Sequence, residues 1–486
     1  MGEELFGWKM SHTYATLPNN FFTQTDPTPV SQPSLVLLNT KLARRLDLNA
    51  ARLQEKEGVE ILAGNRVLDS FYPIAQAYAG HQFGHFTMLG DGRAILLGEH
   101  ENETGDTVDI QLKGAGKTPY SRGGDGRAGL GPMLREYIMS EGMHGLGIPT
   151  SRSLAVVETG DQIIREEMLD SAVLTRVSAS HLRVGTFQFA AAYGSIEDVR
   201  ALADYAIVRH DPDLVDEGDK YISFLKRVID RQANLIAKWQ LVGFIHGVMN
   251  TDNMTISGET IDYGPCAFMN TFEPATVFSS IDLDGRYAFQ QQPNIGGWNI
   301  ARFAETLIPL IDEDEEKAVE LAQETISAYG PTYYKYWLRG MREKVGFSVE
   351  KEEDSQLIEA LLDVMKREKM DYTTTFIDLT LELDGKECTA TSEVFRSWRE
   401  RWKKRLEEEE RSTEDIYQQM KRVNPAIIPR NDFVEEALEA AVERRDFASV
   451  QQLITLLENP FAYSDEQKEM MQKEIPKGPF RTFCGT

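Results

Sequence analysis

The chain has 486 residues, of which 41% are apolar and 27% charged, and its formal net charge at pH 7 is −25. These are values of a folded globular protein, so a mainly disordered chain is excluded, and the length predicts two lobes or more. So acidic a surface repels nucleic acid and anionic lipid, and neither is expected as a partner. No apolar run is long enough to span a membrane and the first residues lack a signal sequence, which predicts a soluble, cytoplasmic protein.

The N-terminal part of the chain changes character near residue 80. Before it, Pro and Asn are frequent, which predicts an irregular cover with a short helix near residues 35–46. After it, two strand-length segments separated by turn residues predict a β-hairpin at 93–99 and 107–113. A glycine-rich loop, 114–131, then leads into a helix that begins near Pro132, and more strands are expected at 154–158 and 162–165.

The remainder of the chain is predicted to be helical. Apolar residues recur with helical spacing in 195–210, 221–242 and 299–329, and the last third is helical and strongly charged. The expected organisation is an N-terminal cover (1–80), an N-lobe with nucleotide-binding loops (81–184), a helical C-lobe (185–330) and a helical C-terminal extension (331–486). No heptad pattern is evident, so a monomer is expected.

Positive charge is concentrated in one short region of this acidic protein. The segment from Gln111 to Arg135 contains one acidic residue, Asp125. Its five cations are Lys113, Lys117, Arg122, Arg127 and Arg135. Glycines are also frequent here, so backbone amides and cations together are suited to a small polyanion such as a nucleoside triphosphate.

The segment from His246 to Asn253 has the spacing of a protein-kinase catalytic loop, and Asp262-Tyr-Gly follows where kinases have a metal-binding Asp. Val248, however, occupies the position of the kinase catalytic Asp. Valine can neither accept a proton nor orient a hydroxyl, so the sequence predicts that the nucleotide is held but that ordinary kinase chemistry is altered.

The metal ligands expected in this segment are Asn253 and Asp262, since a carbonyl and a carboxylate are hard oxygen ligands suited to Mg²⁺ or Mn²⁺. Asp252 is the sole carboxylate of the loop and is the candidate proton acceptor. His246 is expected to be a structural residue packed beneath the loop.

Three further elements are expected to contact phosphates. Lys113 ends a strand and precedes Glu136 on the next helix, the order of the kinase Lys–Glu pair. Gly90 and Gly92 lie just before the first hairpin strand, where kinases have a glycine-rich turn whose backbone approaches the nucleotide. The alternative is that Gly-Asp-Gly is an ordinary turn. Two guanidinium groups, seven residues apart, either clamp phosphate or form surface salt bridges; they belong to Arg176 and Arg183.

These strings resemble the selenoprotein O family of pseudokinases over nearly the whole chain. The densest matches are Tyr78–Gly84, Gly90–Arg93, Gln111–Gly116, Pro119–Arg122, Gly124–Arg127, Leu134–Glu136 and His246–Asn253. The resemblance implies an α+β, protein-kinase-like two-lobed fold that binds ATP in a flipped orientation. It also implies transfer of AMP, or of UMP from UTP, to hydroxyl side chains of protein substrates.

By motif match, the resemblance assigns roles to individual residues. Asp252 is the proton acceptor, and Asn253 and Asp262 bind Mg²⁺ or Mn²⁺. Nucleotide contacts fall on Gly90, Gly92, Arg93, Lys113, Asp125, Gly126, Arg176, Arg183 and Asp262. Two other classes remain open: an atypical protein kinase that transfers the γ-phosphate, and a non-catalytic nucleotide-binding scaffold.

The three cysteines, Cys266, Cys388 and Cys484, are too few for a disulfide framework or a zinc site. Animal members of the family end near a selenocysteine, whereas this chain has Cys484. A bridge between Cys266 and Cys484 would tie the tail to the segment after Asp262 and imply redox control; two reduced thiols are the alternative.

Overall fold

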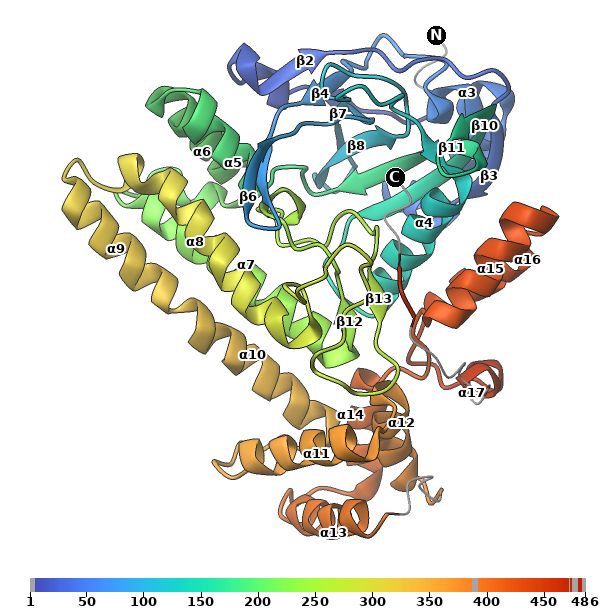
Figure 1. Ribbon diagram of the computed structural model, residues 1–486, viewed down its shortest axis with the longest axis vertical. Helices are drawn as coiled ribbons and strands as arrows, with labels where there is room; N and C mark the ends of the chain where they lie inside the picture. The colour runs from blue at the N-terminus through green and yellow to red at the C-terminus, as the bar shows by residue number, and fades with distance from the viewer. Residues whose placement is uncertain (1–4, 387–391, 472, 474–479, 483–486) are drawn as a thin grey trace.

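The computed structural model describes residues 5–386, 392–471, 473 and 480–482, and it places a sheet-rich lobe above a helical one (Figure 1). The site described below lies where the two lobes meet. A further group of helices extends from the helical lobe, and the last helices return to the sheet-rich lobe. The α+β, two-lobed expectation is confirmed.

The centre of the N-lobe is an antiparallel sheet in the spatial order β4-β7-β8-β11-β10. Counted along the chain, these strands lie in the order first, second, third, fifth and fourth. Lys113 ends the third strand, as the phosphate-contacting Lys of a protein kinase does. The bounds are β4 (Ile74–Gln76), β7 (Ala94–Glu101), β8 (Thr107–Lys113), β10 (Arg152–Ile164) and β11 (Met168–Ser178). The predicted hairpin is therefore β7–β8.

The residues before β4 extend this sheet with three short strands and cover one of its faces, and they contain more regular structure than the sequence predicts. Their apolar side chains, among them Phe6, Leu53 and Leu62, are buried against one face of the sheet. The helix expected near 35–46 is shorter, because the apolar run Ser34–Leu38 is a strand paired with β10. The elements are β1 (Met10–Ser11), β2 (Phe22–Gln24), β3 (Ser34–Leu38), α1 (Thr40–Arg45), α2 (Ala50–Gln54) and α3 (Lys56–Ala63).

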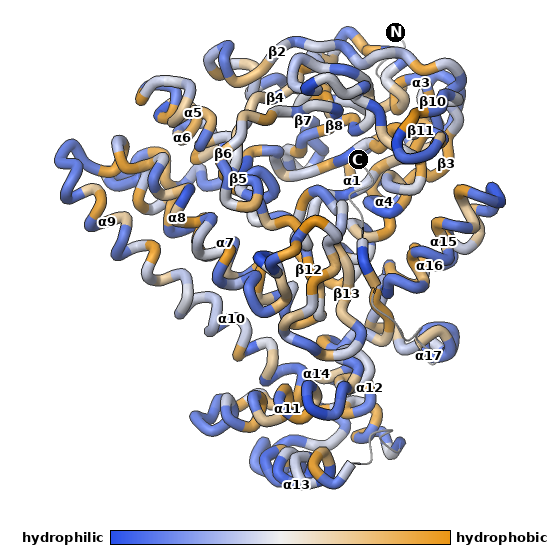
Figure 2. Tube along the Cα trace, viewed as in Figure 1, coloured by the Kyte–Doolittle hydropathy of each residue, from blue (hydrophilic) through white to orange (hydrophobic). Residues whose placement is uncertain are grey.

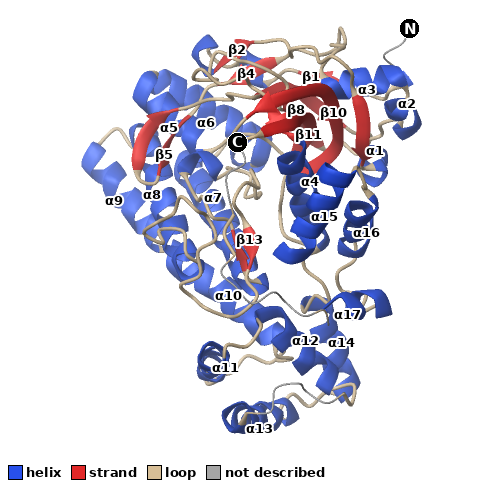
Figure 3. Ribbon diagram, turned by 45° about the vertical axis from the view of Figure 1, so that its right-hand side comes forward, coloured by secondary structure: helices blue, strands red, loops and turns tan. Residues whose placement is uncertain are grey.

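Helix α4 (Leu130–Gly145) covers the opposite face of the sheet and is buried for most of its length. It follows the short strand β9 (Ala128–Gly129), which pairs with β11. Helices α15 (Asn431–Arg444) and α16 (Ala448–Leu457) pack beside α4, as Figure 3 shows. The C-terminal segment thus supports the helix that carries Glu136.

The helical lobe surrounds the catalytic-loop region, which is bracketed by the paired strands β12 (Phe244–Ile245) and β13 (Ala267–Phe268). The helices predicted at 195–210 and 221–242 are present, but the one predicted at 299–329 is broken. Asp312 leaves the helical conformation and Asp314 caps the next helix through its side chain. The bounds are α5 (Val184–Tyr193), α6 (Ile196–His210), α7 (Lys220–Val242), α8 (Gln292–Ile311), α9 (Glu315–Ser327) and α10 (Tyr329–Lys344).

The C-terminal helices form a separate apolar core around the stacked rings of Trp398 and Trp402. Hydrophobic and hydrophilic segments alternate along these amphipathic helices in Figure 2. Across the described residues, no helix combines the length and apolar character needed to cross a bilayer. The bounds are α11 (Asp354–Glu368), α12 (Tyr372–Glu382), α13 (Glu393–Glu407), α14 (Thr413–Val423) and α17 (Asp465–Met471).

Candidate active site

A cleft of about 590 Å³ lies between the two lobes, and every predicted site residue lines it. The sheet-rich lobe contributes residues of the two glycine-rich segments and of β8 and β11, whereas the helical lobe contributes the loop around Asp252. A second cleft, of about 700 Å³, lies among the C-terminal helices and contains none of the predicted residues.

A buried ion-pair network forms the floor of the cleft. Lys113 Nζ lies 2.6 Å from Glu136 Oε2 and 2.5 Å from Asp262 Oδ1. Glu136 also pairs with Arg176, which lies 3.5 Å from Asp262. The predicted Lys–Glu pair is therefore present, and α4 supplies its carboxylate. Because Glu136 is only 3% exposed, the pair fixes the ammonium at the end of β8.

Asp262 is held ionised in a left-handed backbone conformation. Its φ is +62°, a region that non-glycine residues seldom adopt. Desolvation opposes ionisation, but the charges of Lys113, Arg176 and Arg93 outweigh it and hold the pKa of the carboxyl well below its usual range. The side chain is 35% exposed toward the cleft. An ionised, accessible carboxylate is what a divalent cation requires.

Asn253 and Asp252 lie in a short 3₁₀ turn, η5 (Thr251–Asn253). Asn253 Nδ2 donates to the carbonyl of Val248 at 3.1 Å. This hydrogen bond does not use the amide oxygen of Asn253. Val248 itself lines the cleft. His246 is buried with Nε2 3.0 Å from the Ile261 carbonyl, and burial lowers its pKa, so it supports the loop as an uncharged residue.

The carboxylate of Asp252 is buried and only partly satisfied. Its Oδ1 has no hydrogen-bond partner, and desolvation raises the pKa of the carboxyl to about 6. The strand β5 (Ala79–Gln82) causes much of this burial: a Cβ on Gly80 would lie 2.5 Å from Asp252 Oδ1. A carboxylate with a raised pKa beside a cleft is suited to accept a proton.

Two glycine-rich segments meet above the floor of the cleft. Gly90 has a φ of +110°, and a Cβ there would lie 2.4 Å from the Tyr120 ring. Gly126 has a φ of +71°, and its Cβ would lie 2.0 Å from the Gly116 carbonyl oxygen. Only glycine fits at these two positions, because a side chain would collide with the Tyr120 ring in one case and with the Gly116 backbone in the other. Asp125 pairs with Arg165 at 2.8 Å, which anchors this loop to β10 and β11.

Arg176 and Arg183 reach the cleft from two different elements. Arg176 lies on β11, whereas Arg183 is the residue before α5, with its guanidinium 4.1 Å from the Tyr78 ring and 3.5 Å from Asp91 Oδ1. Both are buried and both line the cleft, so they are not surface salt bridges.

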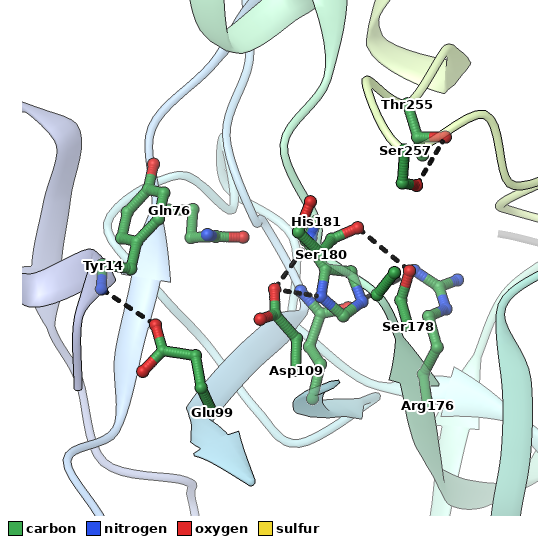
Figure 4. Close-up of polar contacts among 12 residues, drawn as sticks. Tyr14, Gln76, Glu99, Asp109, Arg176, Ser178, Ser180, His181, Thr255 and Ser257 are labelled. Atoms are coloured by element: carbon green, nitrogen blue, oxygen red, sulfur yellow. Dashed lines mark hydrogen bonds and ion pairs between the residues drawn. The ribbon is translucent and has the colours of Figure 1, made fainter. Parts of the chain in front are cut away.

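Polar contacts fix the stretch between these two arginines (Figure 4). Asp109 on β8 accepts a hydrogen bond from the backbone N–H of His181 at 2.8 Å and lies 3.1 Å from its Nδ1. Ser178 Oγ donates to the Ser180 carbonyl at 2.9 Å. The position of the Arg183 guanidinium is therefore tied to the central sheet.

The cationic region identified in the sequence is only partly directed at the cleft. Lys113, Arg122 and Arg127 line it, but Arg135 is buried between Glu435 and the Cys266 carbonyl, at 2.6 and 2.7 Å. Sequence proximity to the glycine-rich loop was misleading here, because α4 turns this guanidinium toward α15.

Sequence reasoning missed several residues that line the cleft. Tyr78 and Asp91 contact Arg183, Gln82 and Phe83 come from the loop between β4 and β7, and Arg165 comes from the β10–β11 turn. The sequence signals were the Tyr78–Gly84 and Gly90–Arg93 strings, which contain all of these residues except Arg165 but do not reveal their contacts without the fold. Cys388 and Cys484 lie outside the described residues, and Cys266 is a buried free thiol.

The described residues fit a nucleotide-bound divalent cation better than a metal held by protein alone. No group of three or more His, Cys, Asp or Glu side chains arranged for a metal exists among them. Asn253 and Asp262 instead present two oxygen ligands to one cleft lined by cations, an arrangement typical of Mg²⁺ or Mn²⁺ that shares phosphate oxygens.

The fold and site define a kinase-like enzyme class in which the Lys–Glu pair and an Asp at the position of the kinase metal ligand remain, whereas the catalytic-loop Asp is replaced. The sequence profile of the family described as "Protein adenylyltransferase SelO" matches residues 5–458. The protein nucleotidyltransferase YdiU of Geobacillus kaustophilus is 58% identical over 482 residues, covering 99% of each chain. That of Brevibacillus brevis is 57% identical over 481 residues, covering 99% of this chain and 98% of the relative. The chain therefore belongs to the SelO family of nucleotidyltransferases.

Among solved structures, a match is found to ROP2 from Toxoplasma gondii, described as a virulence factor with a protein-kinase fold and no enzymatic activity. The identity is 11%, the match covers 69% of this chain and 88% of that chain, and the TM-score is 0.24. At this TM-score the two structures are too different for the ROP2 site to be compared with this one.

Proposed function

We propose that the protein transfers AMP from ATP, and UMP from UTP, to Ser, Thr or Tyr hydroxyls of other proteins. The observation that carries this proposal is the position of Asp252: a buried carboxylate with an unpartnered oxygen, in the same cleft as Asn253 and Asp262. It supplies the proton acceptor that Val248 cannot. We further expect the enzyme to act as a monomer in the cytoplasm.

The chemistry follows from the placement of these side chains. The acceptor hydroxyl gives its proton to Asp252, its oxygen bonds to the α-phosphorus, and the bond between the α-phosphorus and the bridging oxygen to the β-phosphate breaks. The departing pyrophosphate takes the negative charge, and cations fixed in the cleft stabilise it. A Mg²⁺ or Mn²⁺ ion on Asn253 and Asp262 would supply further charge neutralisation on phosphate oxygens.

The distribution of cations supports a flipped nucleotide. Lys113 and Arg176 are fixed at the floor of the cleft, and Arg122, Arg127 and Arg165 line the same cleft from the second glycine-rich loop and the β10–β11 turn. A kinase places its terminal phosphate beside the catalytic loop. In the flipped orientation the β- and γ-phosphates would point to the second loop, so that the α-phosphorus faces Asp252.

A kinase that transfers the γ-phosphate is the second candidate, favoured by the intact contact between Lys113 and Glu136. The two candidates differ in which phosphorus becomes attached to the acceptor. The third class, a non-catalytic scaffold, gives no reason for the cleft to keep both Asn253 and Asp262.

The deciding experiment uses ATP labelled at either the α- or the γ-phosphorus. The protein is incubated with each label, Mg²⁺ or Mn²⁺ and a generic acceptor protein such as casein, and protein-bound label is counted. Label retained only from the α-position is expected. Retention only from the γ-position would establish a kinase, and retention from neither would leave a nucleotide-binding scaffold. Repeating the assay with α-labelled UTP tests the second donor.

A further inference from the structure

The loop between β4 and β7 contains a hairpin that bridges the two lobes. Its strands are β5 (Ala79–Gln82) and β6 (His85–Met88), and it occupies the place of the kinase glycine-rich loop. The backbone N–H of His81 donates to Thr251 Oγ1 at 2.7 Å, and that of Phe83 donates to Asn250 Oδ1 at 3.1 Å. The hairpin is thus fixed to the loop that carries Asp252.

The turn of this hairpin is built from Phe83 and Gly84, whose φ angles are +50° and +85°. Such angles belong to the tight two-residue turn that matches the twist of paired strands, but a bulky residue seldom adopts them. The Phe83 ring lies 5.1 Å from that of Tyr287 and lines the cleft. An uncommon conformation is therefore maintained at the entrance to the site.

The outer edge of β6 is unpaired, since within the described residues this two-stranded sheet consists of β5 and β6 alone. The hydrogen bond from Leu89 N–H to the Tyr78 carbonyl, 3.0 Å, fixes which backbone groups face inward. Because pairing alternates in antiparallel strands, the N–H and C=O groups of Phe86 and Met88 face outward. A further extended segment can hydrogen-bond to them.

The two faces of the hairpin differ in character. Gly80, which pairs with Thr87, faces Asp252. Phe86 and Met88 lie on the opposite face, 41% and 36% exposed, and the Phe86 ring stacks at 6.3 Å on Tyr193, which is 54% exposed. One face of the hairpin is therefore turned toward Asp252. On the other face, Phe86 and Met88 are exposed beside Tyr193.

We propose that the outer edge of β6 is the docking strand for the protein substrate, which adds to it as a third strand. This inference rests on the proposed function, because it assumes a polypeptide acceptor. The segment bound is short and extended, since β6 offers only four residues. Gln82 and Phe83, at the turn end of the hairpin, line the cleft that contains Asp252, so a segment added along β6 runs beside the mouth of that cleft.

Strand geometry then sets a sequence preference for the substrate. Side chains of an added strand alternate between the two faces of the hairpin. The hydroxyl residue must lie on the face of Asp252, so its two immediate neighbours lie on the face of Phe86, Met88 and Tyr193. The preferred acceptor is therefore a hydroxyl residue with an apolar residue on each side.

The test compares synthetic peptides that carry one central tyrosine and basic termini. In one set, apolar residues flank the tyrosine directly; in the other, of identical composition, they are moved one position outward. The first set is expected to have kcat/KM higher by about tenfold, the effect of burying one apolar side chain. Equal kcat/KM for both sets would overturn the proposal.

Variants of the edge provide the second arm. Met88→Pro removes an outward N–H without removing a hydrogen bond of the hairpin, and Phe86→Ser removes the apolar face. Each is expected to raise KM for the peptide about three- to tenfold, the effect of one hydrogen bond or contact, with the Kd for ATP unchanged. The matched control is Val208→Ser, a 61% exposed apolar residue on α6, which should leave KM unchanged.

The outcomes separate this proposal from the one on which it rests. If the wild-type protein attaches no α-label to any acceptor, the proposed function fails. If it does, but both variants keep the wild-type KM, only the docking strand is refuted. Sedimentation velocity tests a different occupant: a wild-type dimer that Met88→Pro dissociates would assign the edge of β6 to a second copy of the chain and overturn the proposal.

Discussion

Gly80 lies directly against the carboxylate of Asp252: a methyl group on Gly80 would fall 2.5 Å from Oδ1. This contact joins the hairpin above the cleft to the proton acceptor below it. It also explains why Asp252 is desolvated although it lies in a catalytic loop. The raised pKa of Asp252 therefore depends on the position of the hairpin.

Gly80→Ala tests this relationship. The added methyl group must displace either the carboxylate or β5, and a displacement of about 1 Å at a reacting group lowers kcat by about 10²-fold. Nucleotide affinity should change little, because Gly80 does not line the cleft. Gly131→Ala is the control, since its Cβ would meet nothing closer than 3.6 Å. An unchanged kcat for Gly80→Ala would contradict this prediction, because it would mean that the methyl group is accommodated without displacing Asp252.

Asp252→Asn separates proton transfer from binding. The amide has the same shape but cannot accept the proton, so we expect kcat for α-label transfer to fall by about 10²- to 10⁴-fold. The Kd for ATP, measured by isothermal titration calorimetry, should stay within about twofold, and Asp252→Ala should behave likewise. A wild-type rate in either variant would remove Asp252 from the role of proton acceptor.

Asp262→Ala is expected to abolish transfer through loss of metal binding. The variant removes the ionised ligand, and Asn253 alone offers a single neutral oxygen. Binding of Mn²⁺ in the presence of a non-hydrolysable ATP analogue, followed by electron paramagnetic resonance, reports the metal independently of activity. Tight Mn²⁺ binding by the variant would place the metal on other residues.

Glu136→Gln tests the floor of the cleft by stability. Glu136 pairs with both Lys113 and Arg176 and is 3% exposed, so its neutralisation leaves two buried cations undercompensated. A loss of about 3–5 kcal/mol in the free energy of unfolding is expected from urea titration. Glu439→Gln removes a carboxylate that is 59% exposed and pairs with Arg444, itself 56% exposed, and it should cost about 1 kcal/mol or less. Equal losses would contradict the assignment.

A second stability prediction concerns Lys344, a buried lysine at the end of α10. Among the described residues no carboxylate lies within ion-pair distance of it, and its ammonium sits 4.1 Å from the centre of the Phe376 ring. Desolvation lowers its pKa from 10.5 to about 7. Keeping the amine charged inside the fold therefore costs roughly 5 kcal/mol.

The sign of the pH dependence follows. Below pH 7 the amine is protonated in both states and the full cost is present. Between pH 7 and 10.5 the unfolded chain binds a proton that the folded chain does not, so this contribution makes the protein more stable as pH rises. Lys344→Met should be most stabilising below pH 7 and lose that advantage toward pH 10. Lys335→Met, an exposed lysine on the same helix, is the control; an equal pH profile for both variants would refute the assignment.

The parts of the site that could be predicted from the sequence are those encoded by local spacing. Asn253 and Asp262 lie in one short segment, and Lys113 and Glu136 occupy a strand and the helix that follows it. Their meeting in one cleft required only the expected fold. Their chemical roles stay predictions until the experiments above are done.

What the sequence could not reveal depends on contacts between distant segments. Nothing local indicates that Gly80 meets Asp252, or that Arg165 holds Asp125. The direction of Arg135 was misjudged because it depends on α15, which lies far along the chain. The break at Asp312 was missed because apolar residues keep a helical spacing on both sides of it.

The contact between Lys113 and Asp262 has one more consequence. In the protein without nucleotide, the ammonium already serves as the counter-ion of the carboxylate, so a divalent ion arriving by itself must compete with an internal cation. A triphosphate that arrives with its ion offers an exchange of partners, since its oxygens can take Lys113 as the ion takes Asp262. The resting cleft should therefore discriminate against free metal and free nucleotide in favour of the two together.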